Sequence, residues 1–461
     1  MKDIFLFNTL SKQKEKFIPI EEGKVSMYHC GPTVYDYAHI GNLRSYVFAD
    51  TLRRLFEWHN YKVKQIINIT DIGHLSSDAD QGEDKMTKAL KREGRPFTLS
   101  AMREVADFYF EKFKIDLKYL NIKTPSEFPF ASDHIEEDKE LIETLIKKGF
   151  TYKTKDGLYF DTSKDFHYGK LGNIAKNDES RPRIVVNDEK KDFRDFALWK
   201  FNDMGYDTTF GKGFPGWHIE CSAMSMKYLG ETFDIHTGGI DHIPIHHNNE
   251  IAQSENATGK AFVHFWMHNA FVIVNEDKMA KSANNFTRLI DLIEKGYSPI
   301  AYRMLLLQSH YRSPMNFSLE ALSGAKEALY GIYRMLSELS SGGNMENSWI
   351  KKFEETINDD LNTPRAVAVL FELLKSDVDS KNKLTTALKF DEVLGLGIKE
   401  NITLLKKETE EIPIIIKNLV AEREVARKNK RFDKADILRQ EIGDLGYIVE
   451  DLESGPKVYK K

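Results

Sequence analysis

Cysteine is scarce in this chain. Of its 461 residues only two are cysteine, Cys30 and Cys221, and they lie far apart in the sequence. So few cysteines exclude a disulfide-rich scaffold, and a single disulfide would be unusual in a reducing compartment. The ordinary interpretation of two isolated cysteines is a pair of buried, unreactive thiols. Their positions, considered below, change that interpretation.

Long apolar segments are also missing. No run of about eighteen apolar residues exists, so the sequence predicts no membrane-spanning helix. The most apolar stretch, residues 262–274, is interrupted by His264, His268 and Asn269. The N-terminal residues, MKDIFLFN, turn polar too soon for a signal peptide. We therefore expect a cytoplasmic protein that has no membrane partner.

A general excess of basic residues is absent as well. The chain has 66 Lys and Arg against 71 Asp and Glu, which gives a formal net charge of −5. This balance excludes a protein that coats nucleic acid through a uniformly basic surface. It still allows a local basic surface that binds RNA. Hydrophobic residues make up 41% of the chain, as in ordinary folded proteins. The length predicts two to four domains.

The first hundred residues carry the pattern of an α/β sheet. Residues 24–30 and 62–70 are predicted strands, and apolar residues recur at helical spacing between them, over 42–58. A strand, helix and strand of this length predict a parallel pair with a right-handed crossover. We therefore expect a doubly wound, Rossmann-type sheet, and its strand pattern resumes at 233–236 and at 269–274.

The remainder of the chain predicts an insertion and a helical C-terminal half. Residues 115–211 mix helix and short-strand patterns, which suggests an insertion into the sheet domain. Beyond about residue 320 the pattern is helical, and Thr363-Pro364 predicts the start of a helix. The polar run 400–411 predicts a linker to a small C-terminal domain.

Four residues suggest a metal site. Cys30 ends the first predicted strand, where ligand sites of parallel sheets gather. His246 and Glu250 lie one turn apart on a predicted helix, about 25 residues after Cys221. Two thiolates, one imidazole and one carboxylate form a donor set that suits Zn²⁺. The alternative is a His–Glu pair on a solvated helix, and spacing alone does not bring the four residues together.

Two short motifs suggest a nucleotide site. His39, Gly41 and Asn42 stand at the start of a predicted helix, whose free backbone N–H groups attract phosphate. Gly41 allows close approach of a ligand, and His39 can donate a hydrogen bond to phosphate. Much later, Lys278 and Lys281 of the segment KMAKS could neutralise the charge of a leaving pyrophosphate. The alternatives are a helix-capping histidine and an ordinary lysine-rich loop.

Taken together, the motifs resemble those of class I aminoacyl-tRNA synthetases, and among these the cysteinyl-tRNA synthetase family along nearly the whole chain. The HIGH-type and KMSKS-type motifs of the class correspond to residues 38–42 and 278–282. The matching segments are YHCGPTVYDYAHIGN (28–42), NITD (68–71), GWHIECSAM (216–224), DIHTGG (234–239), HHNNEIAQS (246–254), KMAKS (278–282), HYRSPMNFS (310–318), DDLNTP (359–364) and residues 431–446.

The resemblance implies roles for particular residues of this chain. It places Cys30, Cys221, His246 and Glu250 on the zinc ligands, with one ion per chain. It places Thr70, Trp217 and His236 in the cysteine pocket. His39, Gly41, Asn42, Lys278 and Lys281 fall on the ATP motifs, and His39, Asn42, Lys278 and Lys281 are the expected catalytic residues.

The sequence departs from the family pattern at three places. Asn42 replaces the second histidine of the HIGH-type motif, and Ala280 replaces the first serine of the KMSKS-type motif. Asparagine can still cap the helix or donate to phosphate, so we expect function to survive. A longer acidic run, residues 72–84, follows NITD, and no role is carried over to its carboxylates.

The resemblance also implies an organisation and an activity. The expected parts are a catalytic domain (1–114 and 212–265), a connective insertion (115–211), a stem-contact region with KMAKS (266–319), a helical bundle (320–405) and an anticodon-binding domain (406–461). The expected enzyme is a monomer that activates L-cysteine with ATP and Mg²⁺ and transfers it to the 3′ end of tRNA(Cys). The alternative is a cysteine-activating amide ligase of the mycothiol-biosynthesis type, which shares the zinc and ATP motifs but lacks a tRNA-reading domain.

Overall fold

The computed structural model describes residues 3–73, 75–77, 81–172, 189–274, 277–278, 287–452 and 455–460. The chain forms two compact units. The first comprises residues 1–326, 351–368 and 392–395, and the second comprises 327–350, 369–391 and 396–461. Among the described residues, no helix has both the length and the apolar character that crossing a membrane requires.

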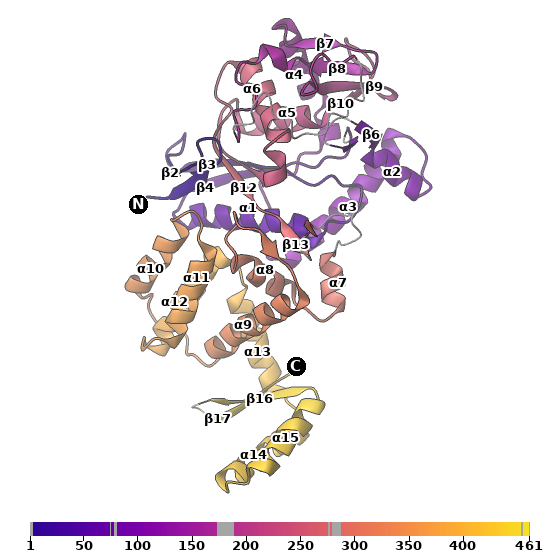
Figure 1. Ribbon diagram of the computed structural model, residues 1–461. Helices are drawn as coiled ribbons and strands as arrows, with labels where there is room; N and C mark the ends of the chain where they lie inside the picture. Colours follow the sequence, from indigo (N-terminus) through magenta and orange to yellow (C-terminus); the bar gives the residue numbers. More distant parts are fainter. Residues whose placement is uncertain are drawn as a thin grey trace. The chain divides into compact units, whose positions relative to one another are not determined.

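A four-stranded parallel sheet organises the first unit (Figure 1). Its strand order is β12-β11-β3-β4, and the strands are Val263–Asn269, Phe233–Gly239, Lys24–His29 and Lys62–Ile67. Helix α1 (Ile40–Trp58) makes the crossover from β3 to β4, as the sequence predicts. Both β3 and β11 are buried along most of their length, because helices cover both faces of the sheet. The doubly wound parallel fold is confirmed.

One strand of the sheet lies earlier than the sequence suggests. The expected strand at 269–274 is wrong, because the strand that pairs with β11 is β12, which ends at Asn269. Residues 272–274 form β13 in a separate three-stranded sheet with β14 (Asp277–Lys278) and β15 (Met315–Asn316). His264, His268 and Asn269 interrupt the apolar pattern of β12 and so conceal a strand that the sheet nevertheless buries.

Three strands of a second, antiparallel sheet lie in the predicted insertion, and its fourth strand, β10, lies just beyond the expected end at residue 211. Its order is β10-β9-β8-β7, and the strands are Gly213–Pro215, Phe196–Tyr206, Gly157–Phe160 and Thr151–Lys153. Helix α4 (Ile135–Lys147) packs against α5 (Trp217–Leu229) and α6 (His246–Thr258), and these helices share one apolar core with both sheets. The other elements before residue 310 are β1 (Phe5–Asn8), β2 (Gln13–Lys16), β5 (Leu75–Ser77), β6 (Gln81–Asp84), α2 (Lys85–Arg92), α3 (Leu99–Tyr119), α7 (Leu289–Glu294) and α8 (Pro299–Leu307).

The chain after β15 is helical as far as residue 444. The helices are α9 (Leu319–Ser337), α10 (Asn347–Ile357), α11 (Thr363–Lys375), α12 (Ser380–Leu394), α13 (Ile398–Glu410), α14 (Ile414–Lys428) and α15 (Phe432–Asp444). Helix α11 begins at Thr363-Pro364, as expected. The expected linker at 400–411 is wrong, because α13 occupies it. Lysine and glutamate are good helix formers, and the buried side chains of Ile398 and Ile402 anchor the helix.

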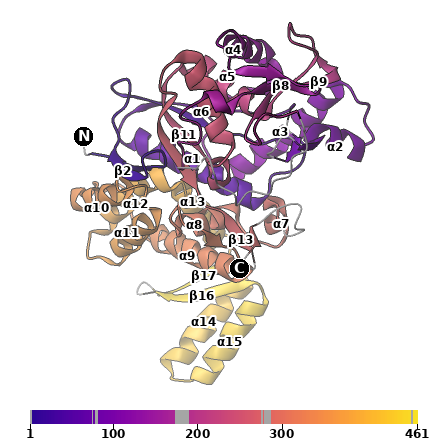
Figure 2. The same cartoon turned by 45° about the horizontal axis from the view of Figure 1, so that its top comes forward.

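The C-terminal residues form a small folded module. Figure 2 shows α14 and α15 side by side, with the hairpin of β16 (Tyr447–Leu452) and β17 (Gly455–Lys460) beside them. The module has its own apolar core, made of Ile412, Ile416, Val420, Ile442, Val449 and Val458. A basic run, RKNKR at residues 427–431, lies at the break between α14 and α15.

Candidate active site and metal centre

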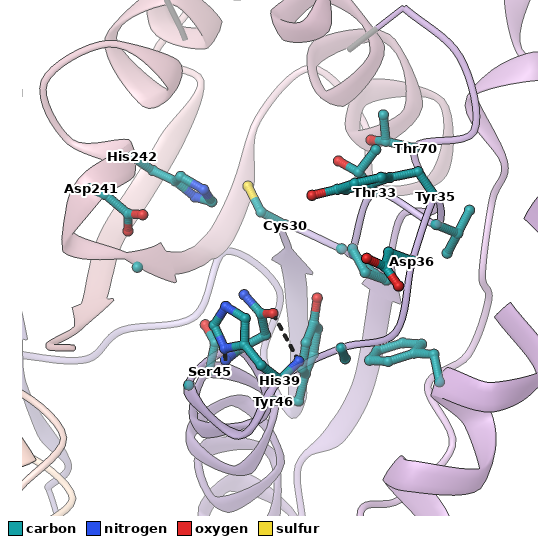
Figure 3. A pocket seen from close by; sticks show the side chains of 18 of the residues that line it. Cys30, Thr33, Tyr35, Asp36, His39, Ser45, Tyr46, Thr70, Asp241 and His242 are labelled. Carbon is teal, nitrogen blue, oxygen red and sulfur yellow. Dashed lines mark hydrogen bonds between the residues drawn. The ribbon is translucent and has the colours of Figure 1, made fainter. Parts of the chain in front are cut away.

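A cavity lies beside the parallel sheet, at the point where the direction of chain winding changes. Helix α1 leaves β3 toward β4, while β11 lies on the other side of β3. Crevices at such points, outside the carboxyl ends of the strands, are where doubly wound sheets bind ligands. The cavity measures about 580 Å³. Figure 3 shows Cys30 at the end of β3, between Asp241 and His242 on one side and Thr33 and Thr70 on the other.

Close backbone packing shapes the turn after β3. A Cβ atom at Gly31 would lie 1.4 Å from the carbonyl oxygen of Asn68, so only glycine fits there. The Gly31 N–H donates to Asn68 Oδ1 at 2.8 Å. These contacts hold the ends of β3 and β4 together and bring Cys30 near Thr70, which pairs with Thr33 in an isolated bridge.

The four predicted metal ligands lie together. One potential ligand atom from each of Cys30, Cys221, His246 and Glu250 falls within 4.8 Å of the other three, and all four residues are buried. Cys30 ends β3, Cys221 lies on α5, and α6 carries both His246 and Glu250. The i, i+4 spacing on α6 sets His246 Nε2 3.1 Å from Glu250 Oε1. The fold thus joins residues that are 220 positions apart in the sequence.

Contacts among the buried side chains of this cluster strongly shift their pKa values. Burial disfavours charge, but His236 and His246 offset it and lower the pKa of Glu250 to about 2. Burial also opposes ionisation of His246, but Glu250 and Cys221 raise its pKa to about 10. A hydrogen bond from the Cys30 thiol lowers the pKa of Cys221 to about 6, whereas burial raises that of Cys30. The cluster therefore favours a thiolate and a carboxylate in a buried position.

This donor set fits a borderline-soft divalent cation. Two sulfurs, one imidazole and one carboxylate are ligands that tetrahedral zinc accepts. Glu250 Oε1 is fully buried, and although His246 Nε2 lies 3.1 Å away, their contact lacks the geometry of a hydrogen bond. A bound cation would satisfy that oxygen and compensate the negative charge of the thiolate and carboxylate.

Buried histidines that the sequence interpretation did not single out surround the cluster. His247 Nε2 lies 3.3 Å from Cys30 Sγ, and its Nδ1 lies 2.7 Å from His268 Nε2. His218 Nδ1 lies 2.9 Å from His246 Nδ1. Burial lowers the pKa of His218, His247 and His268, which keeps these rings neutral. The sequence could have indicated two of them, because His218 and His247 directly follow the motif residues Trp217 and His246.

The predicted nucleotide motif forms the start of helix α1 and lines the same cavity. His39 is the N-cap residue, and its Nδ1 accepts a hydrogen bond from the Asn42 N–H at 3.1 Å. The Asn42 side chain accepts a bond from the His39 N–H at 3.2 Å. Because Nδ1 is the acceptor, a neutral His39 ring carries its proton on Nε2. His39, Gly41 and Asn42 all line the cavity.

The second nucleotide motif lies largely outside the described residues. Lys281 is not among them. The backbone of Lys278 belongs to β14, which pairs with β13 at Ile273. Val272 of β13 lines the cavity, so the strand before the motif reaches the site. The roles of both lysines remain predictions.

Two of the three predicted cysteine-pocket residues line the cavity. These are Thr70 and Trp217, and the Trp217 ring lies 4.2 Å from that of His246, centroid to centroid. His236 is not a lining residue. It lies behind Glu250, with its Nε2 2.9 Å from Glu250 Oε2 and its ring stacked on Trp266. In this position His236 can orient the carboxylate of Glu250. Its contact with the substrate stays a prediction.

Three protein-family models match the chain. The model for the class I (C) tRNA synthetase catalytic domain matches residues 16–327. A DALR domain matches residues 352–398, and the cysteinyl-tRNA ligase anticodon-binding domain matches residues 409–455.

Curated proteins match over the whole length. A cysteine–tRNA ligase of Burkholderia lata is 43% identical over 98% of this chain and 96% of its own length. The chain belongs to the cysteinyl-tRNA synthetase family. Another family member, the cysteine–tRNA ligase of Treponema denticola, is also 43% identical, over 99% of both chains.

Solved structures of class I synthetases share the fold. A methionyl-tRNA synthetase from Mycobacterium tuberculosis, in complex with methionyl-adenylate, aligns with a TM-score of 0.56 at 15% identity, over 82% of this chain and 91% of its own. A LeuRS–tRNA complex from Agrobacterium radiobacter aligns with a TM-score of 0.58 at 11% identity, over 84% and 86% of the chains. At these identities the similarity supports the fold alone.

Proposed function

We propose that this chain is an ATP-dependent cysteine–tRNA ligase. It forms cysteinyl-adenylate and pyrophosphate from L-cysteine and ATP, and then transfers cysteine to the 3′ end of tRNA(Cys). The observation that carries this proposal is that one cavity is lined both by Cys30, Cys221 and His246 and by the start of helix α1. A thiol-binding cluster and a phosphate-binding helix end therefore face the same space.

In the first step the substrate carboxylate attacks the α-phosphorus of ATP, and pyrophosphate leaves. Such reactions depend on positioning and on stabilising the charge that develops. The Nε2 proton of His39 can donate to the triphosphate, and Gly41 lets the triphosphate approach the backbone at the start of α1. Lys278 and Lys281 neutralise the opposite side, and Mg²⁺ accompanies the ATP.

Selection of cysteine over serine depends on the ligand cluster. Cys30, Cys221, His246 and Glu250 hold one Zn²⁺, which when bound supplies a soft, Lewis-acidic contact for the substrate sulfur. Thr70 and Trp217 form the adjoining walls of the cavity. An apolar pocket alone would discriminate weakly between near-isosteres, so the metal provides the selectivity and serine is rejected at activation.

Transfer requires that the enzyme hold tRNA. We assign residues 115–211 and 266–319 to the acceptor end, 320–405 to a supporting bundle and 406–461 to the anticodon. The family match over residues 409–455 supports the last assignment. The same match argues against the amide-ligase alternative, which has no tRNA-reading domain. A cytoplasmic monomer is consistent with this activity.

Cysteine-dependent ATP–pyrophosphate exchange, followed by aminoacylation of tRNA(Cys), tests the proposal. We expect exchange with cysteine, charging of tRNA, about one zinc per chain, and serine-dependent exchange at least a hundredfold slower. Exchange without charging of tRNA would support the amide ligase. An absence of exchange with zinc-loaded protein would refute both enzymes.

A further inference from the structure

The metal cluster offers more ligands than one ion requires. Cys30 and Glu250 take part in two sets of four potential ligands, one completed by Cys221 and His246 and the other by His236 and His247. In each set the four ligand atoms lie within 4.8 Å of one another. We propose that one zinc ion binds through either set, with Cys30 and Glu250 shared and the other two ligands exchanged.

The distances within the second set support this proposal. His247 Nε2 lies 3.3 Å from Cys30 Sγ and 3.9 Å from Glu250 Oε1, and His236 Nε2 lies 2.9 Å from Glu250 Oε2. With zinc–ligand bonds of about 2.0–2.3 Å, ligand atoms of a tetrahedral site are separated by roughly 3–4 Å. The described atoms are thus near ligand spacing without a change of backbone.

The two imidazoles of the second set are also held in orientation. His247 Nδ1 contacts His268 Nε2 at 2.7 Å, and His268 Nδ1 contacts Thr9 Oγ1 at 2.8 Å. Support of this kind, through the nitrogen that does not bind the ion, is usual for metal-binding histidines. The His236 ring stacks on Trp266 with 4.6 Å between centroids. Both His236 and His247 are fully buried.

The two sets differ in what they present to the cavity. Cys221 and His246 line it, whereas His236 and His247 do not. The first set also has two sulfurs, which zinc prefers among these donors. We therefore assign the first set to the working site. The second set retains the ion, farther from the substrate, when Cys221 or His246 cannot bind it.

Zinc X-ray absorption on the full-length protein as purified tests this inference, because it counts sulfur and imidazole ligands separately. Wild-type protein should contain two sulfurs and one imidazole. Both Cys221→Ala and His246→Ala should retain one zinc, bound by one sulfur and two imidazoles. His218→Ala is the matched control, because His218 contacts His246 but belongs to neither set, and it should keep the wild-type ligand count.

Affinity provides a second measurement, by chelator competition. His247→Ala should weaken zinc binding at least tenfold more in the Cys221→Ala background than in wild type, because only there is His247 a ligand. The inference is overturned if His246→Ala keeps two sulfurs, if Cys221→Ala binds zinc with one imidazole, or if either variant folds without zinc. It rests on the metal site of the proposed function. Zinc-free, active wild-type protein would refute the metal site of the proposed function. Variants whose zinc does not move to His236 and His247 would refute only the second ligand set.

Discussion

His39 and Asn42 cap the first turn of helix α1 for each other. The His39 ring accepts the Asn42 N–H at 3.1 Å, and the Asn42 amide oxygen accepts the His39 N–H at 3.2 Å. This reciprocal pair is a capping box built from a histidine and an asparagine. It explains how asparagine can stand where the HIGH-type motif has its second histidine, since Asn42 fixes the ring that faces the cavity.

Replacing Asn42 should therefore affect catalysis through His39. We expect Asn42→Ala to slow cysteine-dependent exchange about fivefold, on the scale of the ~1 kcal/mol that a lost cap costs. Asn42→Gln, whose longer amide can also reach the His39 N–H, should recover most of the rate. Steady-state exchange kinetics measure both variants. Equal losses in the two would mean that Asn42 acts by direct contact with phosphate and not through the cap.

Lys281→Ala should lower the rate of adenylate formation by about a hundredfold while the KM for cysteine changes little. The reason is that its charge is needed mainly as pyrophosphate leaves, after cysteine has bound. Zinc content should stay at the wild-type value. Lys295→Ala is a suitable control, because Lys295 is an exposed cation at the end of α7. An unchanged exchange rate would remove Lys281 from the catalytic residues.

Asp71 should make stability depend on pH. Burial raises its pKa to about 6, although it accepts hydrogen bonds from the Ser132 N–H and hydroxyl. The folded state therefore binds this proton more tightly than the unfolded state. Stability falls as pH rises from about 4 to about 6, by up to about 3 kcal/mol.

Thermal unfolding between pH 4.5 and 7.5 can measure this dependence. Asp71→Asn removes the charge and keeps an acceptor for Ser132, so the variant should gain in Tm relative to wild type as the pH rises. The difference between the two proteins should level off above about pH 7. A difference in Tm that does not vary with pH would show that Asp71 is ionised throughout.

Removing the C-terminal module should separate the two reaction steps. A chain that ends at residue 411 retains α13 and loses α14, α15 and the β16–β17 hairpin. We expect cysteine-dependent exchange within about twofold of wild type, and a KM for tRNA at least tenfold higher. Charging by the truncated chain with an unchanged KM would contradict the anticodon role.

Within that module, Asp451 forms ion pairs with two arginines. Its two oxygens each lie 2.8 Å from a guanidinium nitrogen of Arg423, and Arg427 contacts it as well. The hydrogen bonds from Arg423 lower the pKa of Asp451. This carboxylate therefore holds β16 to α14 and supports the module in which the basic run 427–431 lies.

Local sequence patterns determined the central fold and the type of chemistry. Apolar spacing located helix α1 and strands β3 and β4, because helices and strands repeat their buried positions at different periods. The same patterns failed at β12, where the buried His268 and Asn269 interrupt the apolar run, and at α13, whose polar sequence favours a helix as much as a linker. The motifs by themselves indicated the donors Cys30, Cys221, His246 and Glu250.

Only the tertiary structure decided which side chains share a space. Cys30 and Cys221 come together because β3 ends beside α5, and no local pattern encodes a contact between residues so distant in sequence. For the same reason the sequence did not indicate that His236 supports Glu250, or that His247 lies 3.3 Å from Cys30. Spacing along one helix determined the His246–Glu250 pair by itself. The packing of one strand, β3, and two helices, α5 and α6, determined the rest of the metal centre, because buried donors from separate elements converge only when the core forms.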